Sequence, residues 1–152
     1  MLRRGGIRFN WRPYPGGAQS YRDTGVALAD ETLKALERAD AILCFDSTLL
    51  DARLLAAAGP DTLIVVNSAQ SPEHFAGALP GRRVMPVDGL SISSRHGLGR
   101  IVNSALLGAF ARAIEAPALE VLARTLSEEA PKKRDENIAA CRDGYAWVEA
   151  QF

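Results

Sequence analysis

The chain has 152 residues, 47% hydrophobic and 24% charged, a composition typical of a globular domain. Lys and Arg together number 18, as do Asp and Glu, and a net charge of zero argues against a general nucleic-acid or anionic-membrane surface. The sequence contains neither a long apolar run of the kind that spans a membrane nor an apolar signal segment at its N-terminus. We therefore expect one cytoplasmic domain over residues 1–152, without nucleic-acid or membrane partners.

Residues 1–25 are dense in Gly, Pro and Arg, which predicts turns rather than regular elements. Within them, residues 7–11 alternate apolar and polar side chains, which suits a short half-buried strand. Arg3, Arg4 and Arg8 cluster in the same segment, and guanidinium groups can bind a phosphate or a neighbouring carboxylate. The alternative is a solvated or subunit-facing basic loop.

The next part of the chain alternates helical and strand-like patterns. Continuous apolar runs predict strands buried on both faces, over residues 41–45, 62–66 and 84–87. Helices are predicted between them, over 30–40, over 49–58 and from Ser71 onward, where Pro72 takes the first helical position. Pro86 cannot donate a hydrogen bond to a neighbouring strand, which places the third strand at a sheet edge or strand end.

After Gly99 the chain is predicted to be helical, with three helices whose starts or breaks are marked by Pro117 and Pro131. Their apolar faces comprise, in order, Leu106, Leu107, Phe110 and Ile114; Leu119, Leu122 and Leu126; and Ile138, Cys141, Tyr145 and Val148. The whole pattern predicts an α/β fold: a mostly parallel, Rossmann-like three-layer sheet with a helical C-terminal third.

Few residue patterns point to chemistry within the chain. His74 and His96 are isolated in the sequence, so we predict no metal site and no catalytic residue, and His96 lacks a visible partner to orient it as a general base. Cys44 and Cys141 are the only cysteines, and we predict that both are buried and unpaired. Gly97-Leu98-Gly99 is interpreted as a turn rather than a phosphate-binding loop.

Polar side chains follow each of the three predicted strands. Ligands of open α/β sheets bind outside the carboxyl ends of the strands, so these residues are candidates for a ligand or partner crevice. The alternative is that they are helix N-caps, because Asp, Asn and Ser are favoured there. With the residue that opens the later helical region, the candidates are Asp46, Ser47, Asn67, Ser68, Asp88 and Asn103.

Several stretches, taken in order, resemble a known family. They are Arg3-Arg4-Gly5-Gly6, the strand-ending segments 46–50 and 64–68, the segment 87–90 with 98–111, and Lys132-Lys133 followed by 136–140 and Gly144-Tyr145. This order resembles the gamma subunit, or gamma domain, of the 2-oxoacid:ferredoxin oxidoreductases, which act on pyruvate, 2-ketoisovalerate and related substrates. The resemblance covers nearly the whole chain.

The resemblance implies a subunit of a complex that decarboxylates a 2-oxoacid and passes electrons to ferredoxin or NAD, usually forming an acyl-CoA. Thiamine diphosphate, 4Fe-4S clusters and coenzyme A are implied in the complex, with thiamine-diphosphate-binding and iron–sulfur subunits as partners. The chain itself is expected to bind no cofactor and to have no activity alone.

The chain differs from the family pattern at its start. The family's gamma part opens with a strand, a "Gly-x-Gly-Gly-Gln-Gly" loop and a helix, and this chain begins at about the stretch that follows them. The difference favours oligomerisation, because it is expected to leave a sheet edge exposed. Two alternatives stay open: a stand-alone interaction or scaffold domain without oxidoreductase activity, and a small-ligand-binding α/β module.

Overall fold

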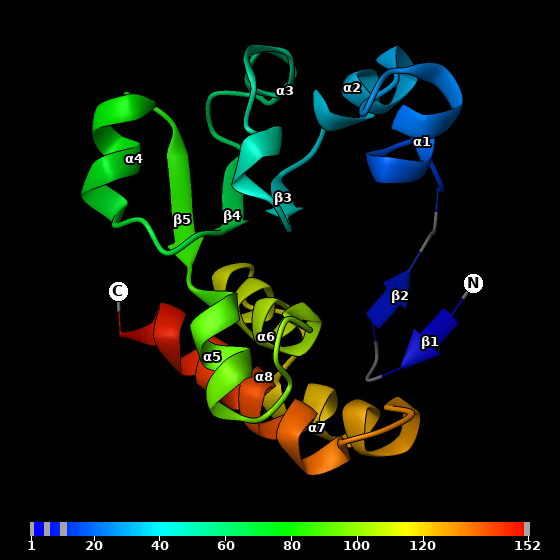
Figure 1. The fold of residues 1–152 in the computed structure, drawn as a ribbon, viewed down its shortest axis with the longest axis vertical. Coiled ribbons are helices and arrows are strands. Elements are labelled where there is room, and N and C mark those ends of the chain that lie inside the picture. Colours follow the sequence, from blue (N-terminus) through cyan, green and yellow to red (C-terminus); the bar gives the residue numbers. More distant parts are fainter. Residues whose placement is uncertain (1, 5–6, 10–11, 151–152) are drawn as a thin grey trace.

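The computed structural model describes residues 2–4, 7–9 and 12–150. Within these residues the strands form two separate sheets (Figure 1). The first is an antiparallel pair, β1 (Leu2–Arg4) and β2 (Ile7–Phe9), in which Arg3 lies opposite Arg8. The second is parallel and has the order β3 (Ala41–Cys44), β4 (Leu63–Asn67) and β5 (Arg83–Val87). The three strands expected from the apolar runs therefore form a parallel sheet, as predicted.

Each strand of the parallel sheet presents alternate side chains to its two faces. One face places Ile42 against Ile64 and Val84, whereas the other carries Leu63 and Val65. The central strand β4 is buried along four consecutive residues, which explains why its sequence is a continuous apolar run. The strand β5 lies at an edge of the sheet, and this confirms the position that Pro86 predicted.

Short helices cover the first face of the sheet. They are α2 (Asp30–Leu36), α3 (Ala52–Ala57), the 3-10 helix η1 (Ser47–Leu49) and α4 (Pro72–Ala78), with α1 (Gly17–Thr24) preceding them. Ile42 and Ile64 pack against Leu54 and Ala58 at the α3 end. Cys44 and Val66 pack against Phe75 of α4. The two apolar clusters hold this layer onto the sheet.

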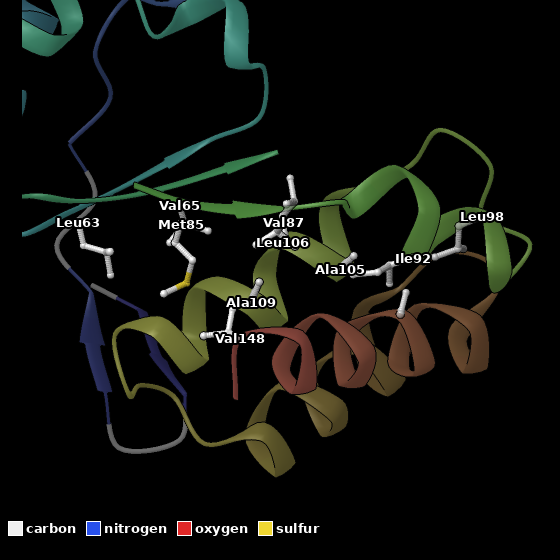
Figure 2. Close-up of a cluster of buried hydrophobic side chains, with 11 residues drawn as sticks. Leu63, Val65, Met85, Val87, Ile92, Leu98, Ala105, Leu106, Ala109 and Val148 are labelled. Carbon is white, nitrogen blue, oxygen red and sulfur yellow. The ribbon is translucent and has the colours of Figure 1, made fainter. Parts of the chain in front are cut away.

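Longer helices cover the opposite face. They are α5 (Gly89–Arg95), α6 (Asn103–Ala113), α7 (Leu119–Glu129) and α8 (Arg134–Glu149). Figure 2 shows side chains of β4 and β5 meeting those of α5, α6 and α8 in one cluster, which includes Val65, Val87, Ile92, Leu106 and Val148. The predicted three-layer architecture with a helical C-terminal third is therefore confirmed.

The helices α6 and α8 run in the same direction in contact. Ser104 meets Asn137 near their starts, and Ala109 and Val148 share a cluster further along both. A β-carbon at Gly144 would lie only 1.9 Å from the carbonyl oxygen of Ala105, and one at Gly108 would lie 1.9 Å from that of Cys141. Only glycine allows so close an approach, so the two backbones touch at both positions.

Some sequence predictions were wrong in detail. Residues 17–24 form the helix α1, although the Gly, Pro and Arg content of residues 1–25 predicted turns, and α5 was not predicted. The predicted helix 49–58 is divided, because the carboxylate of Asp51 accepts hydrogen bonds from Arg53 N and Leu54 N and starts α3 there. The starts of α7 and α8 lie two and three residues after Pro117 and Pro131, at Leu119 and Arg134.

The apolar faces predicted for α6 and α8 were only partly correct. Leu106, Cys141 and Val148 are buried, but Leu107 is 36% exposed and Ile114 is 41% exposed. The buried faces also contain small residues that the pattern of large side chains did not reveal, namely Ala105, Gly108, Ala109, Ala140 and Gly144. Because α6 and α8 approach each other closely through these small residues, some of the large apolar residues on the two helices, such as Leu107, remain partly exposed.

Candidate functional site

The polar residues at the carboxyl ends of the strands mainly form hydrogen bonds with nearby backbone groups. The carboxylate of Asp46 accepts hydrogen bonds from Thr48 N and Oγ1 at 2.9 and 2.8 Å, and that of Asp88 accepts one from Ser91 N at 2.9 Å. Both residues are N-caps, of η1 and of α5. The hydrogen bonds from Thr48 lower the pKa of Asp46, which keeps it an acceptor. The capping alternative therefore describes these two residues.

Asn67, the last residue of β4, contacts the segments that follow β3 and β5. Its Nδ2 donates to the carbonyl oxygen of Phe45, just after β3, at 3.2 Å. Its Oδ1 lies so close to Gly89, just after β5, that a β-carbon there would sit 2.9 Å away. The neighbouring Ser68 donates its backbone N–H to Val87 at 3.0 Å and accepts from Gln70 N through its hydroxyl at 3.1 Å. Ser47, the first residue of η1, lies at the same edge.

Asn103 belongs to a different site. It opens α6 and lines a hollow of about 500 Å³ between the start of α6, the end of α7 and the start of α8. The remaining lining residues are Leu98, Ile101, Ser104, Leu126, Ala130, Pro131, Lys132, Lys133 and Asn137. The structure therefore brings five of the six crevice candidates to one sheet edge and places the sixth elsewhere.

Asn137 organises one wall of this hollow. Its Oδ1 accepts from Ser104 Oγ at 2.6 Å, and its Nδ2 donates to the carbonyl oxygens of Lys132 and Lys133 at 3.1 and 2.7 Å. Lys133 has a φ of 52°, in the left-handed region, and its ammonium group donates to the carbonyl of Gly97. The side chain of Asn137 thus ties the turn before α8 to α6.

His96 has a partner that the sequence did not reveal. Its Nε2 lies 2.8 Å from Oδ2 of Asp143, and Arg95 contacts the same oxygen at 3.3 Å. Asp143 is on α8, 47 residues further along the chain, so no local pattern signals the pairing. The expectation that His96 has no orienting partner was therefore wrong. The contact connects the end of α5 to α8.

Both cysteines are buried and free, as predicted. Cys44 lies in the cluster around Phe75, and its Sγ donates to the carbonyl of Asp46 at 3.0 Å. Burial raises the pKa of Cys44 and raises that of Cys141 to about 11. Both thiols are therefore protonated at neutral pH and are poor nucleophiles.

The candidate basic cluster lies on the N-terminal strands. Arg3 and Arg4 belong to β1 and Arg8 to β2, but their side chains lie outside the described residues. Anion binding by these arginines stays a prediction. Among the residues that the structure describes, no three His, Cys, Asp or Glu side chains gather where they could hold a metal ion. None of the described helices is both long and apolar enough to cross a membrane.

A family model described as pyruvate ferredoxin/flavodoxin oxidoreductase matches residues 23–147. The chain belongs to this family. The match includes the parallel sheet and nearly all of α8. The resemblance inferred from the sequence is thereby confirmed at the level of the family.

A solved structure supports the same assignment. The fold is similar to subunit PORC of pyruvate oxidoreductase from Thermotoga maritima, with a TM-score of 0.64 and 25% sequence identity. The match covers 74% of this chain and 65% of the Thermotoga subunit, so the chain spans about two thirds of that protein's length. No curated protein matches the sequence.

The motifs that resemble the pyruvate ferredoxin/flavodoxin oxidoreductase family have structural roles here. Gly108 and Gly144 permit the contact of α6 with α8, and Asn137 fixes the turn before α8. The two cysteines lie in separate clusters, and an iron–sulfur cluster usually takes four thiolates, so the chain alone does not fit one. Asn137 and Asp143 were missed as organising residues, although Asn137 lies in a motif quoted from the sequence.

Proposed function

We propose that the chain is a subunit of a pyruvate:ferredoxin or flavodoxin oxidoreductase complex. The observation that carries this proposal is the family match over residues 23–147. The complex would oxidise pyruvate or a related 2-oxoacid such as 2-ketoisovalerate, with coenzyme A as acyl acceptor, and would act in the cytoplasm. Ferredoxin, flavodoxin or NAD would receive the electrons.

The same proposal assigns the reaction centre to other subunits. Thiamine diphosphate and 4Fe-4S clusters would be bound there, because this chain offers only two cysteines, both buried in separate clusters. The strand-end carboxylates that could serve an active site, Asp46 and Asp88, already accept backbone hydrogen bonds. This chain would position its partners and perform no chemical step.

Exposed apolar side chains support a role in assembly. Phe45 follows β3 and is 46% exposed, and Leu90 on α5 is 47% exposed. Both follow strands at the carboxyl edge of the sheet, on either side of Asn67. Large apolar residues that remain exposed at one edge are typical of protein–protein contacts. We infer that this edge faces a partner subunit.

The test is purification of the tagged native chain from its own cells, followed by mass spectrometry and a visible spectrum. We expect larger subunits to co-purify, a brown colour from iron–sulfur clusters, and pyruvate-dependent reduction of ferredoxin or methyl viologen. Removal of this chain from the complex should reduce that activity, and adding it back should restore it. A colourless preparation of this chain alone would overturn the proposal.

Phe45→Ser and Leu90→Ser sharpen the test, because both residues are exposed and need not affect folding. Each should reduce the yield of the complex. Ile114→Ser is the matched control, since Ile114 is 41% exposed but follows the end of α6 rather than a strand of the sheet. Equal yields from all three variants would exclude the carboxyl edge as the contact.

A further inference from the structure

The hollow between α6, α7 and α8 has apolar walls that are open to solvent. Leu98, Leu126, Ala130 and Pro131 contribute to it, and Ile101 is 57% exposed in the loop that leads into α6. Ile101 extends the apolar surface of the hollow, and contiguous exposed apolar surface is typical of an interaction site. The volume of about 500 Å³ is sufficient for one or two large side chains.

The charged side chains that line this hollow are positive. They are Lys132 and Lys133, and none of the described lining residues is acidic. Four acidic residues lie close to the lining in sequence, Glu128 and Glu129 at the end of α7 and Asp135 and Glu136 on the first turn of α8, but none of them is among the lining residues. Lys133 is held by the carbonyl of Gly97, whereas Lys132 is exposed. An occupant that carries carboxylates next to an apolar group is therefore complementary to the hollow.

The polar side chains do not favour a small molecule. Ligand pockets orient small molecules through a few convergent polar groups. In this hollow Asn137 uses its Oδ1 and Nδ2 on Ser104 and on two backbone carbonyls, and Ser104 donates its hydroxyl to Asn137. Among the described lining side chains, the exposed amide of Asn103 and the lysine ammonium groups are left for polar contact. Recognition therefore rests mainly on apolar contact and on charge, as in protein–protein docking.

We propose that this hollow is the docking site for an acidic segment of a partner subunit, with a large apolar side chain inserted between α6, α7 and α8 and flanking carboxylates beside Lys132 and Lys133. The identity of the partner rests on the proposed function, but the chemistry of the segment does not. This surface is separate from the edge that carries Phe45 and Leu90.

A model peptide tests the chemistry on the isolated full chain. Acetyl-Glu-Glu-Leu-Phe-Glu-Glu-amide should shift the amide NMR signals of residues 98–104 and 126–137, and the same peptide with Lys in place of Glu should not. Lys132→Glu should weaken binding at least tenfold. Lys34→Glu is the matched control, because Lys34 is the only other lysine and lies on α2, away from the hollow.

A second pair of variants tests the apolar contact. Ile101→Ser should weaken binding of the peptide at least fivefold. Ile114→Ser, an exposed aliphatic position at the end of α6 that does not line the hollow, should leave binding unchanged. The proposal is overturned if the acidic peptide produces no shifts, or if Lys34→Glu weakens binding as much as Lys132→Glu. It is also overturned if isovalerate produces the same shifts at the same concentrations, since the hollow would then bind a small carboxylate.

The native complex separates this proposal from the proposed function. Where the tagged wild-type chain retains oxidoreductase subunits identified by mass spectrometry, Lys132→Glu should reduce their recovery at least tenfold and Lys34→Glu should not. Unchanged recovery with Lys132→Glu overturns the docking site and leaves the proposed function intact. If the wild-type chain retains no such subunits, the proposed function fails and the peptide titration alone decides the docking chemistry. Self-association that Lys132→Glu abolishes would make the occupant a second copy and overturn the partner-subunit assignment.

Discussion

The helices α3 and α4 cover one face of the sheet with six and seven residues, whereas α6 and α8 on the opposite face run for 11 and 16 residues. Helices of six or seven residues are unstable alone. Asp51 and Ser71 cap them, and large side chains such as Phe75 anchor them. The longer helices have no side-chain N-cap and meet through glycine. The helices of the first layer therefore depend on side-chain caps and anchors, whereas the contact of α6 with α8 in the second layer depends on positions without a side chain.

The largest effect should come from adding a carbon between α6 and α8. Gly144→Ala places a β-carbon about where the carbonyl oxygen of Ala105 lies, so the helices must separate along their length. We expect a loss of about 3 kcal/mol or more in the free energy of unfolding, and the double variant with Gly108→Ala should not fold cooperatively. Urea denaturation followed by circular dichroism measures both.

Gly77→Ala provides the matched control in the other layer. Gly77 lies in α4, and a β-carbon added there would meet no atom within 4 Å, so alanine should stabilise the helix by about 0.5–1 kcal/mol. Opposite signs for the two substitutions would confirm that the layers differ in packing. Equal losses would show that the contact of α6 with α8 is not specific.

Phe75→Ala should produce the next largest effect. The ring is 6% exposed and packs on Cys44 and Val66, so its removal should cost about 3 kcal/mol through lost burial and a cavity. Thermal unfolding by calorimetry should show a lower Tm. His74→Ala is the control, because the neighbouring imidazole is exposed. A loss as large for His74→Ala as for Phe75→Ala would argue against the anchoring role.

Removal of a cap should have a smaller effect. Asp51→Ala leaves the N–H groups of Arg53 and Leu54 without their acceptor and should cost about 1 kcal/mol, while Asp51→Asn should retain most of the stability. The measurement is the urea midpoint. Asp61→Ala, in an exposed turn, should leave the midpoint unchanged. An unchanged midpoint for Asp51→Ala would mean that tertiary contacts alone start α3.

The smallest effect is a dependence on alkaline pH. Burial raises the pKa of Cys141 to about 11 from an unfolded value of 9.0, so the unfolded chain loses this proton first. The contribution of this thiol to the free energy of unfolding is fully present below pH 9. It declines as the pH rises toward 11, and the loss is about 1 kcal/mol at pH 10. Compared with Cys141→Ala, the wild-type chain should lose this additional stability between pH 8 and pH 10. Parallel curves would contradict a buried, protonated thiol.

The parallel sheet could be predicted from sequence because its strands are continuous runs of Ile, Leu and Val between turn residues. Helix α1 could not, since its start at Gly17 has the composition of a turn. The small-residue faces of α6 and α8 escaped prediction because periodicity follows large side chains, and close contact selects small ones. At the sheet edge, the sequence could not distinguish a cap from a ligand group for Asp46 and Asp88. The pair His96–Asp143 depends on a tertiary contact and leaves no local signal.

The backbone contacts at Gly108 and Gly144 couple α6 and α8, so we expect the two helices to move as one rigid unit. At the start of α8, Lys133 and Asn137 line the hollow. Towards the other end of α8, the indole Nε1 of Trp147 donates a hydrogen bond to the carbonyl oxygen of Pro86, on the edge strand β5, at 3.2 Å. Because the backbones of α6 and α8 touch, a change in helix orientation at the hollow should be transmitted to the other end of α8, with little accommodation by side-chain rearrangement between the helices. We expect the fluorescence of Trp147 to change when the hollow is occupied, so the indole can serve as an intrinsic probe of docking.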